Sequence, residues 1–159
     1  MHAIVVTHHG GPEVLQWREE PNPVPGPGHV LVQTRAAGVN FIDTYLRRGL
    51  YPSDPPYIPG SEGAGVVIAV GDGVSERALG RRVAWCDGPG SYAEQVVIDA
   101  ARTVEVPNTI GDDVAGTMLL QGLTAHYLLI GAAQPRAGET ILVHAGAGGV
   151  GLILTQLAV

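Results

Sequence analysis

Short apolar stretches dominate the first two thirds of the chain, and their spacing is typical of β-strands. Residues 2–6 and 30–33 are rich in β-branched side chains, which favour strands. Between them, the proline- and glycine-rich residues 21–28 can form neither a helix nor a central strand. Residues 63–70 are a continuous apolar run that ends in turn residues at 71–73, which predicts a strand buried on both faces.

Further strands are predicted at residues 82–86, 92–98 and 102–106, with turn residues between them. The one helix expected in this part of the chain covers residues 41–48. Six or more strands before residue 108, with so little helix, predict a barrel-like or rolled all-β unit.

The pattern changes after residue 108. Residues 112–130 are rich in Ala, Leu, Met and Gln, and Gly122 divides this helical pattern into two predicted helices. Residues 141–144 predict a short buried strand. From Gly148 onward the pattern predicts a helix that still continues at Val159.

Composition narrows the possible classes of protein. The 159 residues, 45% of them hydrophobic, suffice for one packed domain but not for two full-sized ones. A net charge of −6 argues against binding to nucleic acid or to an anionic membrane surface. No apolar run looks long enough to cross a bilayer, and the first ten residues do not resemble a signal peptide. The single cysteine, Cys86, cannot form an intramolecular disulfide, so a cytoplasmic location is expected.

A glycine-rich turn carries the main chemical signal. Gly146, Gly148 and Gly151 match the pattern G-x-G-x-x-G between a predicted strand and a predicted helix. In such a turn the first glycine allows a tight bend, the second lets a pyrophosphate approach the backbone, and the third lets helix and strand pack closely. The unpaired N–H groups of the helix then face the phosphates. The alternative is a close-packed turn that binds no ligand.

Several blocks of residues resemble the quinone oxidoreductases of the zeta-crystallin group, which are zinc-independent medium-chain dehydrogenases/reductases. The blocks are 38–52 (GVNFIDTYLRRGLYP), 59–65 (PGSEGAG), 122–129 (GLTAHYLL) and the glycine turn with Gln156. The resemblance implies a mainly β GroES-like barrel domain followed by the first β-α unit of a Rossmann domain. Residues 1–120 would be the amino-terminal portion of the catalytic domain, and residues 121–159 the start of a truncated NAD(P)-binding domain.

The resemblance also implies an activity. We expect hydride transfer from NADPH or NADH to a quinone or activated enone, in a parent enzyme that is a homodimer. The residue that distinguishes NAD from NADP would lie beyond Val159. Zinc is not expected, because one cysteine in the whole chain cannot build a four-cysteine or mixed zinc site.

Resemblance further assigns site residues. Asn40, Tyr45 and Tyr51 are the candidate catalytic residues, because they supply hydrogen-bond donors in the block that resembles the cofactor and substrate cleft. The candidate cofactor-binding residues are Asn40, Tyr45, Thr124, Gly146, Gly148, Gly149, Val150 and Gly151. Each polar candidate has a structural alternative: Asn40 would cap the helix at residue 41, Tyr45 would pack with a solvated hydroxyl, and Thr124 would begin a helix after Gly122.

Two other functions remain open. One is an enoyl-thioester reductase of the same superfamily, and the other is a non-enzymatic role as a crystallin-like protein or folded module. We expect residues 1–159 alone to be inactive and unable to bind cofactor, because one strand and one helix do not make the crevice of a doubly wound sheet.

Overall fold

The computed structural model describes residues 1–159. It divides into two compact units, Met1–Thr117 and Met118–Val159.

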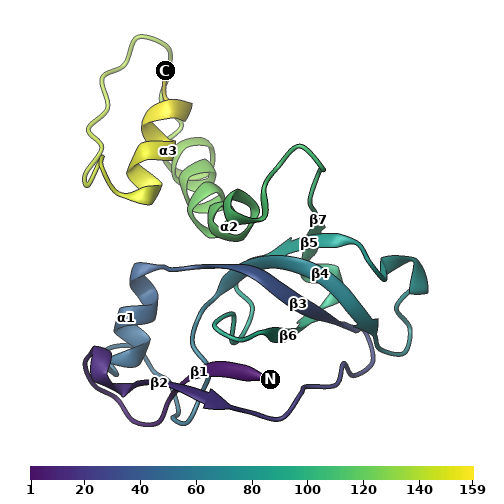
Figure 1. The fold of residues 1–159 in the computed structure, drawn as a ribbon. Helices are drawn as coiled ribbons and strands as arrows, with labels where there is room; N and C mark the ends of the chain where they lie inside the picture. The colour runs from purple at the N-terminus through teal and green to yellow at the C-terminus, as the bar shows by residue number, and fades with distance from the viewer. The chain divides into compact units, whose positions relative to one another are not determined.

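The first unit contains two antiparallel sheets. The strands are β1 (His2–Val6), β2 (Leu15–Glu19), β3 (His29–Gly38), β4 (Glu62–Val70), β5 (Arg82–Trp85), β6 (Gln95–Asp99) and β7 (Thr103–Glu105). β1 and β2 pair with each other, and the remaining five form a sheet in the order β6-β3-β4-β5-β7 (Figure 1). Isolated bridges from Ala3 to Ala93 and from Val6 to Tyr57 join β1 to the segments before β6 and β4. The barrel-like, mainly β prediction is therefore confirmed.

The six predicted strands are all present, with ends shifted by a few residues, and the predicted helix is α1 (Phe41–Arg47). Three single-turn helices also occur: η1 (Pro12–Val14), η2 (Glu76–Ala78) and η3 (Ala100–Arg102). β2 was not predicted. All five of its residues are exposed, so it lacks the continuous apolar run by which most of the other strands were predicted.

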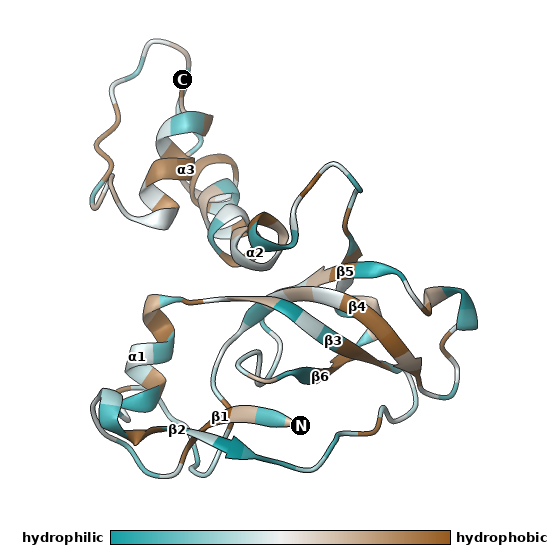
Figure 2. Cartoon of the chain, in the orientation of Figure 1, coloured by the Kyte–Doolittle hydropathy of each residue, from teal (hydrophilic) through white to brown (hydrophobic).

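The hydrophobic core of this unit is a cluster of buried side chains, most of them from the strands. Its buried residues are Ala3, Val30, Val32, Val67, Val83, Trp85, Ala93, Val96 and Ile98. Figure 2 shows the apolar character of β4 in particular. The prediction that β4 is buried on both faces holds only for its first half, because Glu62, Gly63, Ala64 and Gly65 are buried whereas Ile68 is 42% exposed.

The helices of the second half differ from the prediction. A continuous helix, α2 (Asp112–His126), passes through Gly122 without a break and continues as the π-helix η4 (Tyr127–Ala133). One glycine costs a helix only about 1 kcal/mol, which the flanking helix formers offset. The last helix, α3 (Gly149–Leu157), ends two residues before Val159, where helix was still expected.

The strand predicted at residues 141–144 is absent. This segment is irregular, and Leu142 is 82% exposed. An apolar run of this kind becomes a strand only when a neighbouring strand satisfies its backbone groups, and no strand of the second unit lies beside it.

One helical segment is long and apolar enough to cross a membrane by length and composition alone. It is the uninterrupted run Asp112–Ala133, which is 22 residues long. The expectation that no such run exists was wrong, because it divided this segment at Gly122. Length and composition do not separate a bilayer span from a helix that other protein covers.

Candidate functional site

Asn40 lies where β3 ends and α1 begins. It is the N-cap residue of α1, with extended backbone angles, and only 6% of it is exposed. Asn40 and Asp43, the N3 residue of the helix, are placed as in a capping box, with the Asn40 side chain facing the Asp43 backbone. The Asp43 N–H nevertheless donates its hydrogen bond to the Asn40 main-chain oxygen at 3.0 Å. Asn40 therefore occupies the N-cap position that was predicted as its structural alternative.

The Asn40 side chain also has a partner that was not predicted. Its Nδ2 donates to Oε1 of Glu62 at 2.8 Å, and Glu62 is fully buried. Glu62 is the first residue of β4 and stands opposite Gly38 in the β3–β4 register. The sheet thus brings Glu62 to Asn40 from 22 residues away.

Asp43 completes this buried polar network. Its Oδ2 accepts hydrogen bonds from the Asn40 backbone N–H at 2.9 Å and from the Tyr92 hydroxyl at 2.7 Å. Burial and the hydrogen bond to Asp43 raise the pKa of Tyr92 well above its usual range, so the phenol stays protonated as the donor. The second carboxylate oxygen of Asp43, Oδ1, is buried without a hydrogen-bond partner.

Three aromatic side chains lie in a row beside this network. The Tyr45 ring contacts Phe41 edge-on and Tyr51 at a tilt, with ring centroids 5.2 Å apart in each pair. Phe41 and Tyr51 are exposed at 73% and 49%, and Tyr45 is half-buried. The structure therefore brings Tyr45 and Tyr51 together, on α1 and the turn that follows it. These exposed rings provide an apolar surface with two hydroxyl groups at its edge.

The glycine turn has the geometry of a phosphate cradle. Gly148 is the N-cap of α3 and has no side chain, so the first N–H groups of the helix receive no hydrogen bond from their own N-cap residue. A Cβ on Gly151 would overlap the Ala145 carbonyl oxygen and lie 2.7 Å from the Gly146 Cα, so only glycine fits there. The left-handed backbone of this turn falls on Ala145, with φ 52°. These features fit a pyrophosphate group at the start of α3.

Two further side chains of the second unit bear on this turn. A Cβ on Gly149 would overlap Oε1 of Gln121, so the Gln121 amide lies directly against the first turn of α3. Thr124 is inside α2, and its hydroxyl donates to the Leu120 carbonyl oxygen at 2.7 Å. Thr124 therefore does not begin a helix. Its oxygen keeps the capacity to accept a hydrogen bond.

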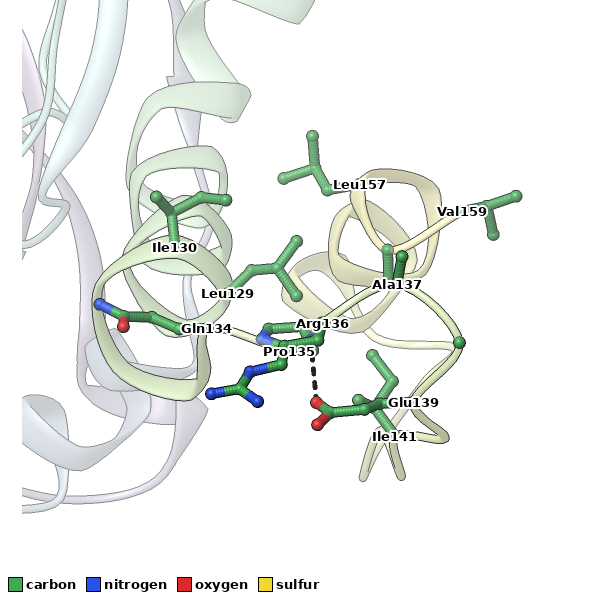
Figure 3. Close-up of a pocket in the computed structure, with 12 residues that line it drawn as sticks. Leu129, Ile130, Gln134, Pro135, Arg136, Ala137, Glu139, Ile141, Leu157 and Val159 are labelled. Atoms are coloured by element: carbon green, nitrogen blue, oxygen red, sulfur yellow. Dashed lines mark hydrogen bonds between the residues drawn. The ribbon is translucent and has the colours of Figure 1, made fainter.

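A pocket of the second unit contains none of the predicted site residues. It has a volume of about 570 Å³ and lies between the end of η4, residues 134–141 and the end of α3 (Figure 3). Leu129, Ile141 and Leu157 supply apolar walls, and the Arg136 N–H donates to Glu139 at 2.8 Å. Nothing in this lining has the character of a reacting group. In the chain as a whole, no three His, Cys, Asp or Glu side chains are grouped so that they could hold a metal ion.

Asn40 was predicted as a site residue from the sequence, but Glu62 and Tyr92, which complete its hydrogen-bond network, were not. Glu62 stood in an apolar strand, where a lone carboxylate signals either function or a buried hydrogen bond. Tyr92 carried no signal, because its contact with Asp43 spans 49 residues.

Comparison with known proteins identifies the family. The alcohol dehydrogenase GroES-like domain matches residues 26–108, and the chain belongs to this family. It is 49% identical over 154 residues to a quinone oxidoreductase of Pseudomonas aeruginosa, covering 94% of this chain and 47% of the relative. Among solved structures it is similar to mycobacterial Rv1454c complexed with NADPH, with 51% identity and a TM-score of 0.95, covering 99% of this chain and 49% of the other. It is also similar to Escherichia coli quinone oxidoreductase complexed with NADPH, with 40% identity and a TM-score of 0.95, over 99% of this chain and 49% of that one. The chain spans about half the length of these relatives.

Proposed function

We propose that the protein containing this chain is an NADPH-dependent oxidoreductase that reduces a quinone or an activated enone without zinc. The observation that carries the proposal is the glycine turn at Gly146–Gly151, whose backbone leaves room for a pyrophosphate at the start of α3. Solved relatives with 51% and 40% identity are described as complexes with NADPH, which supports this choice of cofactor.

The proposal divides the chain by role. Residues 1–120 form the amino-terminal portion of the GroES-like catalytic domain, and residues 121–159 begin the NAD(P)-binding Rossmann domain. Gly146, Gly148, Gly149, Val150 and Gly151 hold the pyrophosphate through backbone N–H groups. Thr124 accepts a hydrogen bond from the cofactor.

The bound nicotinamide supplies a hydride, and this chain's own residues orient the acceptor. Asn40 has two N–H groups on Nδ2, of which one donates to Glu62, so the second can donate to an oxygen on which negative charge develops. Tyr45 and Tyr51 offer hydroxyl donors and aromatic faces to a flat, apolar acceptor. A proton from solvent then completes the two-electron reduction to the hydroquinone.

The substrate class follows from the aromatic row. Phe41, Tyr45 and Tyr51 suit a planar ring better than a flexible chain, which favours a quinone over an enoyl thioester. The relative from Pseudomonas aeruginosa is named a quinone oxidoreductase, which supports the same choice. We propose further that the enzyme is a cytoplasmic homodimer that binds neither nucleic acid nor membrane.

Two assays test the function. The first follows NADPH oxidation at 340 nm by the protein that contains this chain, with a panel of quinones, enones and enoyl thioesters. Turnover of quinones at rates above those of the thioesters is expected. Turnover of thioesters alone would transfer the assignment to the reductase alternative, and no turnover with any acceptor would favour the non-enzymatic one.

The second assay concerns residues 1–159 alone. We propose that they do not bind NADPH, because the only cofactor element among them is one turn and one helix, without paired parallel strands. Calorimetric titration of the isolated chain with NADPH measures this directly. Micromolar binding would show that residues 1–159 are sufficient to bind NADPH, contrary to this proposal.

A further inference from the structure

Glu62 has a buried carboxylate that takes no part in the reaction as proposed above. It is 0% exposed, at the start of β4. A carboxylate withdrawn from water costs free energy unless hydrogen bonds replace its hydration. The hydrogen bond from Asn40 Nδ2, at 2.8 Å, is one such replacement. A position that only filled the core would be better served by an apolar residue of similar size.

The neighbouring strand β3 leaves space for the Glu62 side chain. Gly38 stands opposite Glu62 in the register of β3 and β4. A Cβ on Gly38 would overlap Cγ and Oε1 of Glu62 and lie 2.7 Å from its Cδ. The missing side chain at Gly38 therefore lets Glu62 lie across the end of β3 and reach Asn40, two residues further along.

Two groups hold Asn40 from opposite sides. Its backbone N–H donates to the Asp43 carboxylate, which also accepts from Tyr92, and its side-chain nitrogen donates to Glu62. A carboxylate only accepts hydrogen bonds, so the contact with Glu62 fixes which end of the amide is the nitrogen. Asp43 thus sets where Asn40 lies, and Glu62 sets how its amide is turned.

We propose that Glu62 is a positioning residue that acts on the reaction through Asn40. It holds the amide so that the second Nδ2–H points in one fixed direction toward the reacting groups. This inference rests on the proposed function, because Asn40 is the residue that would touch the ligand. A donor held in advance stabilises developing charge without reorganising, whereas a freely rotating amide presents either end.

A double-mutant cycle separates positioning from simple stabilisation. Glu62→Met replaces the acceptor with an apolar side chain of similar length, and Glu62→Gln keeps an oxygen for Asn40. Both are made in the wild-type and in the Asn40→Ala background, in the protein that contains this chain. The readouts are kcat and KM for the quinone, the thermal unfolding midpoint, and hydrogen exchange of the Asn40 side-chain amide by NMR. Ser91→Ala is the matched control, since Ser91 is also fully buried and accepts from Trp85 Nε1 at 3.3 Å.

Positioning predicts a specific set of results. Glu62→Met lowers kcat by about 10-fold to 100-fold, as a small misplacement of a catalytic group does, and speeds exchange of the Asn40 amide. Glu62→Gln stays within about threefold of the wild-type kcat. In the Asn40→Ala background Glu62→Met has no further effect, and Ser91→Ala leaves kcat unchanged.

Other results would overturn the inference. An equal loss of kcat from Glu62→Met in both backgrounds would mean that Glu62 only supports the fold, and so would unchanged exchange of the Asn40 amide. If the wild-type protein turned over no acceptor at all, the proposed function would fail first. In that case the exchange measurement would still decide whether Glu62 orients Asn40, but its catalytic meaning would be lost.

Discussion

The Tyr92 hydroxyl donates to Oδ2 of Asp43 at 2.7 Å and so joins the segment before β6 to the first turn of α1. Tyr92→Phe removes this donor and leaves a buried carboxylate with one partner fewer, which should cost about 1–2 kcal/mol of unfolding free energy. Chemical denaturation at neutral pH measures the loss. Tyr127→Phe, which removes a phenol from a residue that is 65% exposed, should cost nothing measurable.

The same phenol predicts an alkaline transition. The folded protein raises the pKa of Tyr92. The contribution of this group to the free energy of unfolding is therefore complete below the ordinary tyrosine pKa of about 10, and it is lost as the pH rises toward the folded value. Phenolate absorbance should therefore show a tyrosine that ionises later than an exposed one. Burial also raises the pKa of Tyr57, so in Tyr92→Phe the late part of the titration should shrink by one tyrosine and not vanish. An unchanged late transition would contradict the assignment to Tyr92.

Asn40→Ala should reduce turnover more than stability. Loss of an N-cap costs on the order of 1 kcal/mol, whereas loss of a hydrogen bond to developing charge lowers kcat by about 100-fold or more. The control is Asp99→Ala, because Asp99 caps η3 by accepting from the Ala101 N–H at 2.9 Å. Asn40→Ala should lose somewhat more stability than Asp99→Ala, because it also removes a hydrogen bond from the buried Glu62, but only Asn40→Ala should lose activity. Normal turnover in Asn40→Ala would reduce its role to helix capping.

The contact between Gly149 and Gln121 predicts a reduced gain in helix propensity. Alanine normally stabilises a helix by about 1 kcal/mol relative to glycine. At Gly149 its Cβ would overlap the end of the Gln121 side chain, which must swing away, so Gly149→Ala should stabilise the second unit by less than this amount. With Gln121→Ala the overlap disappears and the ordinary preference for alanine should return. Gly26→Ala, with nothing within 4 Å of the new Cβ, should be close to neutral.

Zinc should be absent from the purified protein. The chain has one cysteine, and no group of three ligand side chains is positioned for a metal. Elemental analysis should find zinc far below one atom per chain, and a chelator should change neither the unfolding midpoint nor turnover. Stoichiometric zinc that survives dialysis would contradict this expectation.

The pH dependence of stability should include an acid step at Asp112. The Arg82 guanidinium donates to its carboxylate at 2.6 and 3.0 Å and, with Arg35, holds the pKa of Asp112 below its usual value. A lowered folded pKa means that the contribution is complete above the ordinary aspartate pKa of about 3.9 and is lost as the pH falls through the folded value. Asp112→Asn should therefore lower the unfolding midpoint at pH 7 and match the wild type in strong acid. Asp113→Asn, in the same turn, serves as the control.

How far the sequence predicts this molecule depends on the range of the interactions involved. The predicted strands of the first unit and α1 follow from local apolar runs and turn residues, and the runs of β1, β3, β4, β5 and β6 contribute buried side chains to the folded unit. β2 carries the same signal faintly, because Leu15 and Trp17 alternate with Gln16 and Arg18, yet none of these side chains is buried. Pairing with β1, and not burial, makes it a strand.

The missing strand in the second half has a definite physical cause. The run at Ile141–Val143 has the composition of a strand, but composition cannot supply the neighbour that a strand needs. The site shows the same limit. Asn40 could be found from its motif, whereas Glu62 and Tyr92 reach the site only through strand register and loop contacts that span 22 and 49 residues.

The two tryptophans of the first unit occupy opposite environments, with an optical consequence. Trp85 is completely buried in the core, while Trp17 is 63% exposed and stacks on His2 with ring centroids 5.1 Å apart. An aqueous quencher such as iodide reaches only Trp17, so it divides the emission of the folded unit into an accessible and a protected fraction. Loss of the protected fraction then reports the opening of the β core by itself, without any added label. One emission spectrum therefore follows the surface and the interior of the unit separately.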